Sequence, residues 1–165
     1  LGLTGRSRQR DRRPKPAELR QLFDYWQGSP RMRSPMVDIV DFAIGTAMRL
    51  GEIVGLRWAD FSPSQRLVTI RDRKHPREKR GNDEVVPLLA VRGIDPVSII
   101  DAQPRGNDRI LPFEVESVGA ACERACANCG IENLRFHDLR HEGVGCLFES
   151  GSSIERLALV SGHKD

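Results

Sequence analysis

The stretch FHDLRHEGVGCLFE, residues 136–149, decides how we interpret the rest of the sequence. His137, Arg140 and His141 are spaced i, i+3 and i+4, so in a helix their side chains project from one face. Charged imidazoles and a guanidinium on one face repel one another, and a bound anion relieves that repulsion. Phosphate suits this role because the planar fork of arginine matches two phosphate oxygens. Taken alone, the triplet is more typical of a solvated polar face than of a phosphate site. The choice between these two interpretations depends on the rest of the sequence.

The size and charge of the chain narrow the class of protein. It has 165 residues, enough for one domain with a sizeable core. The net charge is only +3, but residues 1–20 contain seven lysines and arginines against two acids, and residues 66–80 contain the same numbers. Two basic clusters indicate a polyanionic partner, and a solvated arm is a compatible alternative for the first cluster. No segment resembles a membrane span or a signal peptide, so we expect a cytoplasmic protein.

Four cysteines raise the question of a zinc site. Cys126 and Cys129 form one C-x-x-C pair, but no second pair accompanies it. Cys122 and Cys126 are one helical turn apart in an alanine-rich segment, which suits small buried residues. We therefore expect reduced thiols in the core, as for Cys146, and no metal. A helical scaffold with a cysteine-bound metal is the remaining alternative.

Helical periodicity and turn residues divide the chain into about six helices and one antiparallel hairpin. The expected helices cover residues 17–27, 36–50, 95–102, 113–128, 136–149 and 153–160, with 36–50 as the buried central helix. Two short β-branched runs flank a basic segment that ends in Gly81-Asn82-Asp83, which predicts a hairpin over residues 66–89. Its basic tip is either a finger that enters a DNA groove or a mobile charged loop, and composition does not separate the two.

The motif TAMRLGE, residues 46–52, lies at the expected end of the central helix. An arginine near the end of an apolar helix needs an acceptor, and Glu52, three residues after Arg49, can supply one. The pair is equally compatible with an ion pair that closes a helix and with a functional site.

In their order and spacing, these motifs resemble those of the catalytic domain of the tyrosine recombinases, the phage integrase family. The family's first arginine box falls on TAMRLGE followed by GLRWAD, its H-x-x-R box on His137 and Arg140, and its glycine–histidine pair on Gly162 and His163. The resemblance implies an α+β fold, mainly α-helical with a small antiparallel β-sheet or hairpin. Residues 1–15 would then form a basic interdomain linker and residues 16–165 a C-terminally incomplete catalytic domain.

The resemblance implies a site-specific recombinase that cuts and rejoins DNA through a 3′-phosphotyrosyl intermediate, without ATP, metal or cofactor. Arg49 and Arg140 would bind the charge on the non-bridging oxygens of the transition state, with His163 as a further donor. His137 would accept the proton of the attacking tyrosine, because imidazole titrates near neutral pH. Glu52 would orient the basic residues around it.

The family's catalytic lysine, which protonates the leaving 5′-oxygen, sits on the hairpin. We choose Lys74, because counting forward from the first strand is safer in a long hairpin, and keep Lys79 as the alternative. His141 is expected to form structural hydrogen bonds without taking part in catalysis. The hairpin arginines are expected to bind DNA: Arg71, Arg73, Arg77 and Arg80.

Two features depart from the family pattern. The only tyrosine, Tyr25, precedes every motif and is typical of a residue at the edge of a core, whereas the family's nucleophile follows the glycine–histidine pair. We therefore expect the nucleophile beyond residue 165 and expect the fragment itself to be inactive; the alternative is a non-catalytic DNA-binding remnant of an integrase. Glu142 adds an acid beside the expected phosphate pocket, and nothing in the sequence explains it.

The resemblance also implies partners. Full-length members form tetramers on paired sites in double-stranded DNA, so we expect this fragment to be a monomer with weak, salt-sensitive DNA affinity. A phage or mobile element in a bacterium is the expected source, with the protein at the nucleoid during recombination. A type IB topoisomerase shares the active-site residues, but the spacing and the lack of a recognisable topoisomerase insert argue against it.

Overall fold

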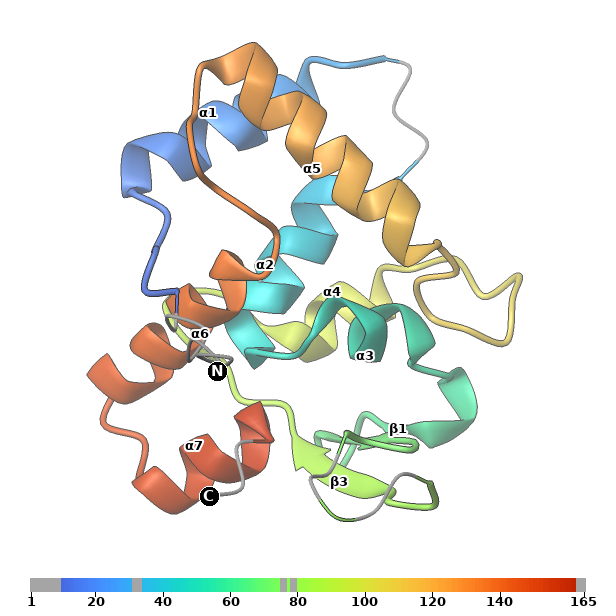
Figure 1. Cartoon of the computed structure of the whole chain (residues 1–165). Coiled ribbons are helices and arrows are strands. Elements are labelled where there is room, and N and C mark those ends of the chain that lie inside the picture. Colours follow the sequence, from blue (N-terminus) through green and yellow to red (C-terminus); the bar gives the residue numbers. More distant parts are fainter. Residues whose placement is uncertain (1–9, 31–33, 75–76, 78–79, 163–165) are drawn as a thin grey trace, which may run out of the picture.

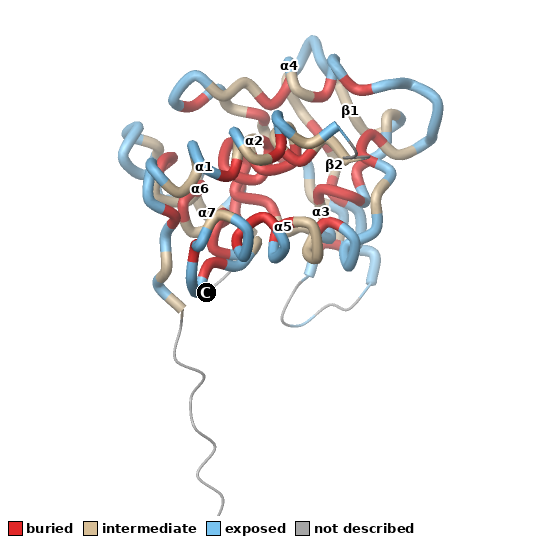
Figure 2. The backbone as a smooth tube through the Cα atoms, turned by 90° about the horizontal axis from the view of Figure 1, so that it is seen from above, coloured by how far each residue is buried: buried red, intermediate tan, exposed pale blue. Residues whose placement is uncertain are grey.

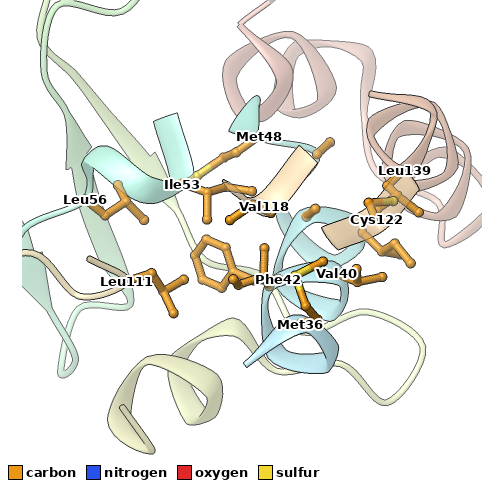
Figure 3. Packing of buried hydrophobic residues seen from close by; sticks show 14 of the residues in the cluster. Met36, Val40, Phe42, Met48, Ile53, Leu56, Leu111, Val118, Cys122 and Leu139 are labelled. Carbon is orange, nitrogen blue, oxygen red and sulfur yellow. The ribbon is translucent and has the colours of Figure 1, made fainter. Parts of the chain in front are cut away.

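Helix α2 (Met36–Thr46) lies at the centre of the protein, whose structure, a computed structural model, describes residues 10–30, 34–74, 77 and 80–162. Most residues of α2 are buried, and their side chains meet those of the surrounding elements (Figure 3). Phe42 has no exposed surface and belongs to one cluster with Ile53, Leu111 and Val118. The prediction of a central apolar helix that starts at Met36 is confirmed.

Seven α-helices are present in the described residues, one more than expected. Besides α2 they are α1 (Pro16–Gln27), α3 (Leu50–Gly55), α4 (Pro96–Asp101), α5 (Val115–Cys129), α6 (Asp138–Glu149) and α7 (Ile154–Ser161). Helices α1 and α5 contact each other at one end of the molecule, whereas α7 packs beside α6 at the other (Figure 1). Figure 2 shows the buried residues gathered between α2 and α5. Within the described ranges, no helix is both long and apolar enough to cross a membrane.

The prediction of a single helix over residues 36–50 is wrong, because the chain breaks there and forms two helices, α2 and α3. Helix α2 ends where Ala47 adopts a left-handed φ of 53°, and the hydroxyl of Thr46 accepts the N–H of Met48 at 3.3 Å. Helix α3 then begins after Arg49, whose N–H donates to Glu52 Oε2 at 3.0 Å in the manner of a helix cap. The break was missed because neither glycine nor proline marks residues 46–49.

The sheet has three antiparallel strands in the order β1-β2-β3. They are β1 (Phe61–Ser62), β2 (Leu67–Ile70) and β3 (Glu84–Pro87), and a 3₁₀ turn (Trp58–Asp60) precedes the first. Strands β2 and β3 form the predicted hairpin, with Val68 opposite Val86 and both side chains buried. The short β1 was not predicted. Helix α7 contacts β3, so the sheet supports the last described helix.

The close contact between α2 and α6 depends on a glycine. A Cβ atom at Gly143 would lie 2.6 Å from the carbonyl oxygen of Ile44 and 3.1 Å from the Cα of Ala47. Both are backbone atoms that cannot turn aside, so a larger residue would push the two helices apart. Because α6 begins at the H-x-x-R motif and α2 ends at the first arginine motif, this contact sets the distance between the two.

Candidate active site

A small hollow lies between the α2–α3 break and the start of α6. Its volume is about 150 Å³, and its lining joins the two predicted motifs: Met48, Arg49, Leu50, Phe136, His137 and Arg140. Since a water molecule in the liquid takes up about 30 Å³, a group of several heavy atoms fits inside. The structure therefore brings together three of the predicted site residues, Arg49, His137 and Arg140, from distant parts of the sequence.

Glu52 holds Arg49 at the wall of this hollow. Its Oε1 accepts from the Arg49 guanidinium at 3.0 Å, and its Oε2 accepts from the Arg49 backbone N–H at the same distance. The side chain of Arg49 is 30% exposed and that of Glu52 only 10%, so the carboxylate lies deeper than the guanidinium it binds. The ion pair lies at the start of α3 and not at the end of a helix. It fixes the direction of the Arg49 side chain, which remains accessible.

Arg140 is buried, and backbone carbonyl groups hold its guanidinium. It donates to the carbonyl oxygen of Ala47 at 3.3 Å and to that of Ser161 at 2.6 Å. Burial, followed by repulsion from Arg49, lowers the pKa of Arg140 to about 10, so the side chain is still protonated at neutral pH. The hollow therefore has a fixed positive charge in its wall, preorganised for an anion.

His137 and His141 lie beside each other at the start of α6. Their rings meet edge to face, with centroids 5.5 Å apart and an interplanar angle of 87°. Partial burial lowers the pKa of His137, and the charges of Arg140, His141 and Arg49 lower it further. A neutral imidazole in the lining of the hollow is able to accept a proton. His141 contacts the His137 ring, but the expected hydrogen bond from it to another described residue is not found.

Arg73 does not lie on the DNA-facing surface where we expected it. Its side chain is 1% exposed. The guanidinium donates to Glu52 Oε1 at 3.2 Å and Glu84 Oε2 at 3.0 Å, and to the carbonyl oxygens of Leu159 at 2.7 Å and Val160 at 2.6 Å. The prediction of DNA contact by Arg73 is wrong, because a side chain so enclosed has no surface to offer. Position within a basic run did not reveal that this one arginine turns inward.

Beyond β2, the other described cations of the hairpin are exposed: Arg71, Lys74, Arg77 and Arg80. Arg71 forms a two-pronged ion pair with Asp60, with distances of 2.8 and 2.9 Å. Pairing of the two segments continues past β2, since the backbone N–H of Arg73 donates to the carbonyl of Asn82 at 2.8 Å. The side-chain amide of Asn82 donates to the carbonyl of Arg73 at 3.0 Å. The chain is thus fixed immediately before Lys74. Lys79 and His163, two other predicted site residues, lie outside the described residues.

The basic segment before α1 binds the acidic side of α6. Arg10 donates to both carboxylate oxygens of Asp138, at 2.7 and 2.9 Å, and Arg13 donates to Glu142 at 2.8 Å and Glu149 at 3.1 Å. Although burial opposes it, the bond from Arg10 helps to lower the pKa of Asp138. Glu142, which the sequence left unexplained, is therefore the partner of Arg13 in the basic segment before α1. The described part of the first basic cluster is docked on the protein and is not a solvated arm.

Tyr25 and the cysteines lie apart from the hollow. Tyr25 is half-buried against the core on α1, at the far end of the molecule from α7, and its interpretation as a core-edge residue is confirmed. All four cysteines are free, and Cys122, Cys126 and Cys146 are buried as expected, whereas Cys129 is half-buried. In the part of the chain that the structure describes, no cluster of three or more histidine, cysteine or acidic residues could hold a metal ion.

Comparison with known proteins identifies relatives of the chain. The family model described as "Phage integrase family" matches residues 13–165. The shufflon-specific DNA recombinase of Escherichia coli is 32% identical over 156 residues, which cover 94% of this chain and 38% of that protein. The integrase of Salmonella phage P22 is 24% identical over 167 residues, which cover 90% of this chain and 40% of that protein. The chain thus spans less than half the length of these curated relatives.

Solved structures share the fold. A lambda integrase tetramer bound to a Holliday junction matches with a TM-score of 0.78 at 19% identity, covering 99% of this chain and 50% of the other. XerA recombinase matches with a TM-score of 0.65 at 18% identity, covering 93% of this chain and 56% of the other. The expected α+β architecture, mainly helical with a small antiparallel sheet, is confirmed. With nearly its whole length matched by the family model and its arginine and histidine motifs gathered at one hollow, the chain belongs to the phage integrase family of tyrosine recombinases.

Proposed function

We propose that the chain is the catalytic domain of a site-specific DNA recombinase of a phage or other mobile element. The observation that carries the proposal is the convergence of Arg49, His137 and Arg140 on a hollow large enough for a phosphate group. Relatives named as a DNA recombinase and a phage integrase support it, as do DNA-bound structures with the same fold. The substrate is double-stranded DNA, and the reaction passes through a 3′-phosphotyrosyl intermediate.

In this proposal the two arginines act on the scissile phosphate. A tyrosine oxygen attacks phosphorus in line with the departing 5′-oxygen, so negative charge gathers on the non-bridging oxygens. Arg140, held by two carbonyls, and Arg49, held by Glu52, meet that charge without having to reorganise. His137 accepts the tyrosine proton, which its lowered pKa permits at neutral pH. The O–P bond that forms replaces the one that breaks, so the strand can be rejoined without ATP.

The leaving 5′-oxygen needs a proton, and we propose Lys74 as its source. The paired backbone just before Lys74 supports this choice, because a general acid has to be held within reach of the atom that it protonates. His163 follows the end of α7 in the sequence and is proposed as a further donor to the phosphate. Arg71, Arg77 and Arg80 are proposed to bind the DNA backbone.

We further propose that residues 1–15 are an interdomain linker, that residues 16–165 are catalytic, and that the attacking tyrosine is supplied from beyond residue 165. Tyr25 is unsuited, since it lies on α1 at the far end of the molecule from α7. The full protein would assemble as a tetramer on paired DNA sites, and it would work at the nucleoid in the bacterial cytoplasm. Residues 1–165 alone would be a monomer that binds DNA weakly.

The test uses the full-length protein and a duplex from the element's own junctions, nicked so that the cleaved end diffuses away. A covalent protein–DNA adduct should accumulate on a tyrosine outside residues 1–165. Arg49→Met and Arg140→Met should each slow its formation by roughly 100-fold or more, the range for loss of one preorganised charge donor. Tight binding without an adduct would instead support a DNA-binding remnant, and undiminished adduct formation by both variants would refute the proposed site.

A second substrate assigns the lysine. If the 5′-bridging oxygen is replaced by sulfur, the leaving group needs no proton, because a thiol is acidic near pKa 8.5. Lys74→Ala should fail on the ordinary duplex and recover on the sulfur-containing one, whereas Lys79→Ala should behave alike on both. The reverse pattern would transfer the role to Lys79.

A further inference from the structure

Three successive carbonyl groups at the end of α7 each accept a hydrogen bond from a buried arginine. Arg73 donates to Leu159 at 2.7 Å and to Val160 at 2.6 Å, and Arg140 donates to Ser161 at 2.6 Å. The last carbonyls of a helix lack partners within the helix and form the negative end of its dipole. Two guanidinium groups therefore satisfy these acceptors and balance their partial charge at the same time.

The same Arg73 guanidinium also binds two carboxylates, one of which holds Arg49. It binds Glu84 at the start of β3 at 3.0 Å and Glu52 at 3.2 Å, and Glu52 in turn binds Arg49 at 3.0 Å. A buried charge is tolerated only when it is paired and hydrogen-bonded, which these acceptors achieve. Arg73 thus connects three segments that lie far apart in the sequence: the hairpin, the start of α3 and the end of α7.

The chain leaves α7 directly over this guanidinium. Gly162 has a left-handed φ of 68°, and a Cβ atom there would lie 2.6 Å from Cζ of Arg73. Glycine is therefore needed at this position both for its backbone conformation and for the space that Arg73 occupies. His163 is the next residue in the sequence.

We propose that Arg73 is a positioning residue that locks the end of α7 to the hairpin and to the Glu52–Arg49 pair, and so fixes the point at Gly162 from which the chain continues to the next residue in the sequence, His163. Arg73 does not touch the substrate in this role. The catalytic part of the inference rests on the proposed function, whereas the structural part concerns only how α7 is held.

Hydrogen exchange measured by mass spectrometry on the full-length protein tests the structural part. Arg73→Lys keeps the charge but replaces a planar fork by a single ammonium group, which cannot reach all of these acceptors. Exchange of the α7 backbone amides should become at least about tenfold faster, since several charged hydrogen bonds are lost. Exchange in α1 and α5 should stay unchanged, which also shows that the variant folds. Arg71→Lys, on the exposed side of the same hairpin, is the matched control and should leave α7 unchanged.

Gly162→Ala disturbs the same contact from the opposite side without removing a charge. It should also speed exchange in α7, because the added Cβ meets the Arg73 guanidinium. If α7 exchanges at the same rate in the unaltered protein, in Arg73→Lys and in Gly162→Ala, the proposed lock does not exist. If Arg73→Lys fails to fold, an unchanged α7 exchange rate in Gly162→Ala still overturns the lock.

A double-mutant cycle on adduct formation tests the catalytic part. If Arg73 acts through His163, Arg73→Lys should slow adduct formation by about tenfold or more when it is the only substitution. In a protein that already contains His163→Ala, the same substitution should change the rate by less than about twofold, because the effects of coupled sites are not additive. Independent effects that multiply would overturn the positioning role. If the unaltered protein forms no adduct, the proposed function and the catalytic half of this inference both fail, while the exchange rates still decide the structural half.

Discussion

Replacing Gly143 by alanine should destabilise the protein, although alanine is ordinarily the better residue inside a helix by about 1 kcal/mol. The reason is the contact between α6 and α2. The new Cβ atom would lie 2.6 Å from the carbonyl oxygen of Ile44 and 3.1 Å from both Cα and Cβ of Ala47. Real Cβ atoms do not approach a backbone oxygen so closely, so one of the two helices has to shift.

The expected size follows from two opposing effects. Overpacking of a core contact costs roughly 1–3 kcal/mol, and the gain in helix propensity offsets about 1 kcal/mol of it. Because the obstructing atoms belong to the backbone, we place the cost in the upper half of that range, which leaves a net loss of about 1–2 kcal/mol. For a domain of this size such a loss lowers the melting temperature by about 2–8 °C.

The assay is thermal unfolding followed by circular dichroism, with Gly119→Ala as the matched control. Gly119 lies within α5, and a Cβ atom there would meet nothing within 4 Å. Its replacement should raise the melting temperature by about 1–4 °C, the usual benefit of removing glycine from a helix. If Gly143→Ala raises the melting temperature as much as the control does, the close α2–α6 contact is refuted.

Three further predictions concern titration and reactivity. Cys129, which is half-buried, should react with an alkylating reagent before Cys146, whose pKa burial raises to about 11; peptide mapping after brief treatment checks this, and earlier labelling of Cys146 would contradict it. Because Asp138 has a lowered pKa in the fold, its pairing with Arg10 stabilises the protein above the unfolded pKa of about 3.9 and is lost as the pH falls through the folded value. Asp138→Asn should therefore flatten the acid side of a plot of melting temperature against pH, and an unchanged slope would count against the pairing. His137 should titrate below about 6.5 in an NMR experiment, and inorganic phosphate should raise that midpoint by offsetting the nearby arginines; a midpoint that phosphate leaves unmoved would argue against an anion in the hollow.

The predictions that succeeded depend on local pattern. The triplet His137, Arg140 and His141 falls at the start of a helix because apolar residues recur at helical spacing behind it, and the hairpin follows from β-branched runs and a turn sequence. The convergence of Arg49 with this triplet could be anticipated only through resemblance to a family, since nothing in either motif specifies the other.

The predictions that failed depend on contacts between distant segments. The helix break at Ala47 is stabilised by Arg140, which donates to its carbonyl from α6, and no local residue announces it. Arg73 and Arg71 are two residues apart in the same basic run, yet only Arg73 finds buried acceptors, because α7 supplies them. Gly145 offers a similar case: a Cβ atom there would lie 2.5 Å from Cζ of Arg13, a residue that sequence spacing cannot place nearby.

The basic segment before α1 is attached to α6 at two successive turns of that helix. Arg10 grips Asp138, the residue directly after His137, and Arg13 grips Glu142 one turn further along. The segment before α1 is therefore tied by ion pairs to the helix that carries Arg140 and begins directly after His137, so the position of that segment and the shape of the hollow depend on each other.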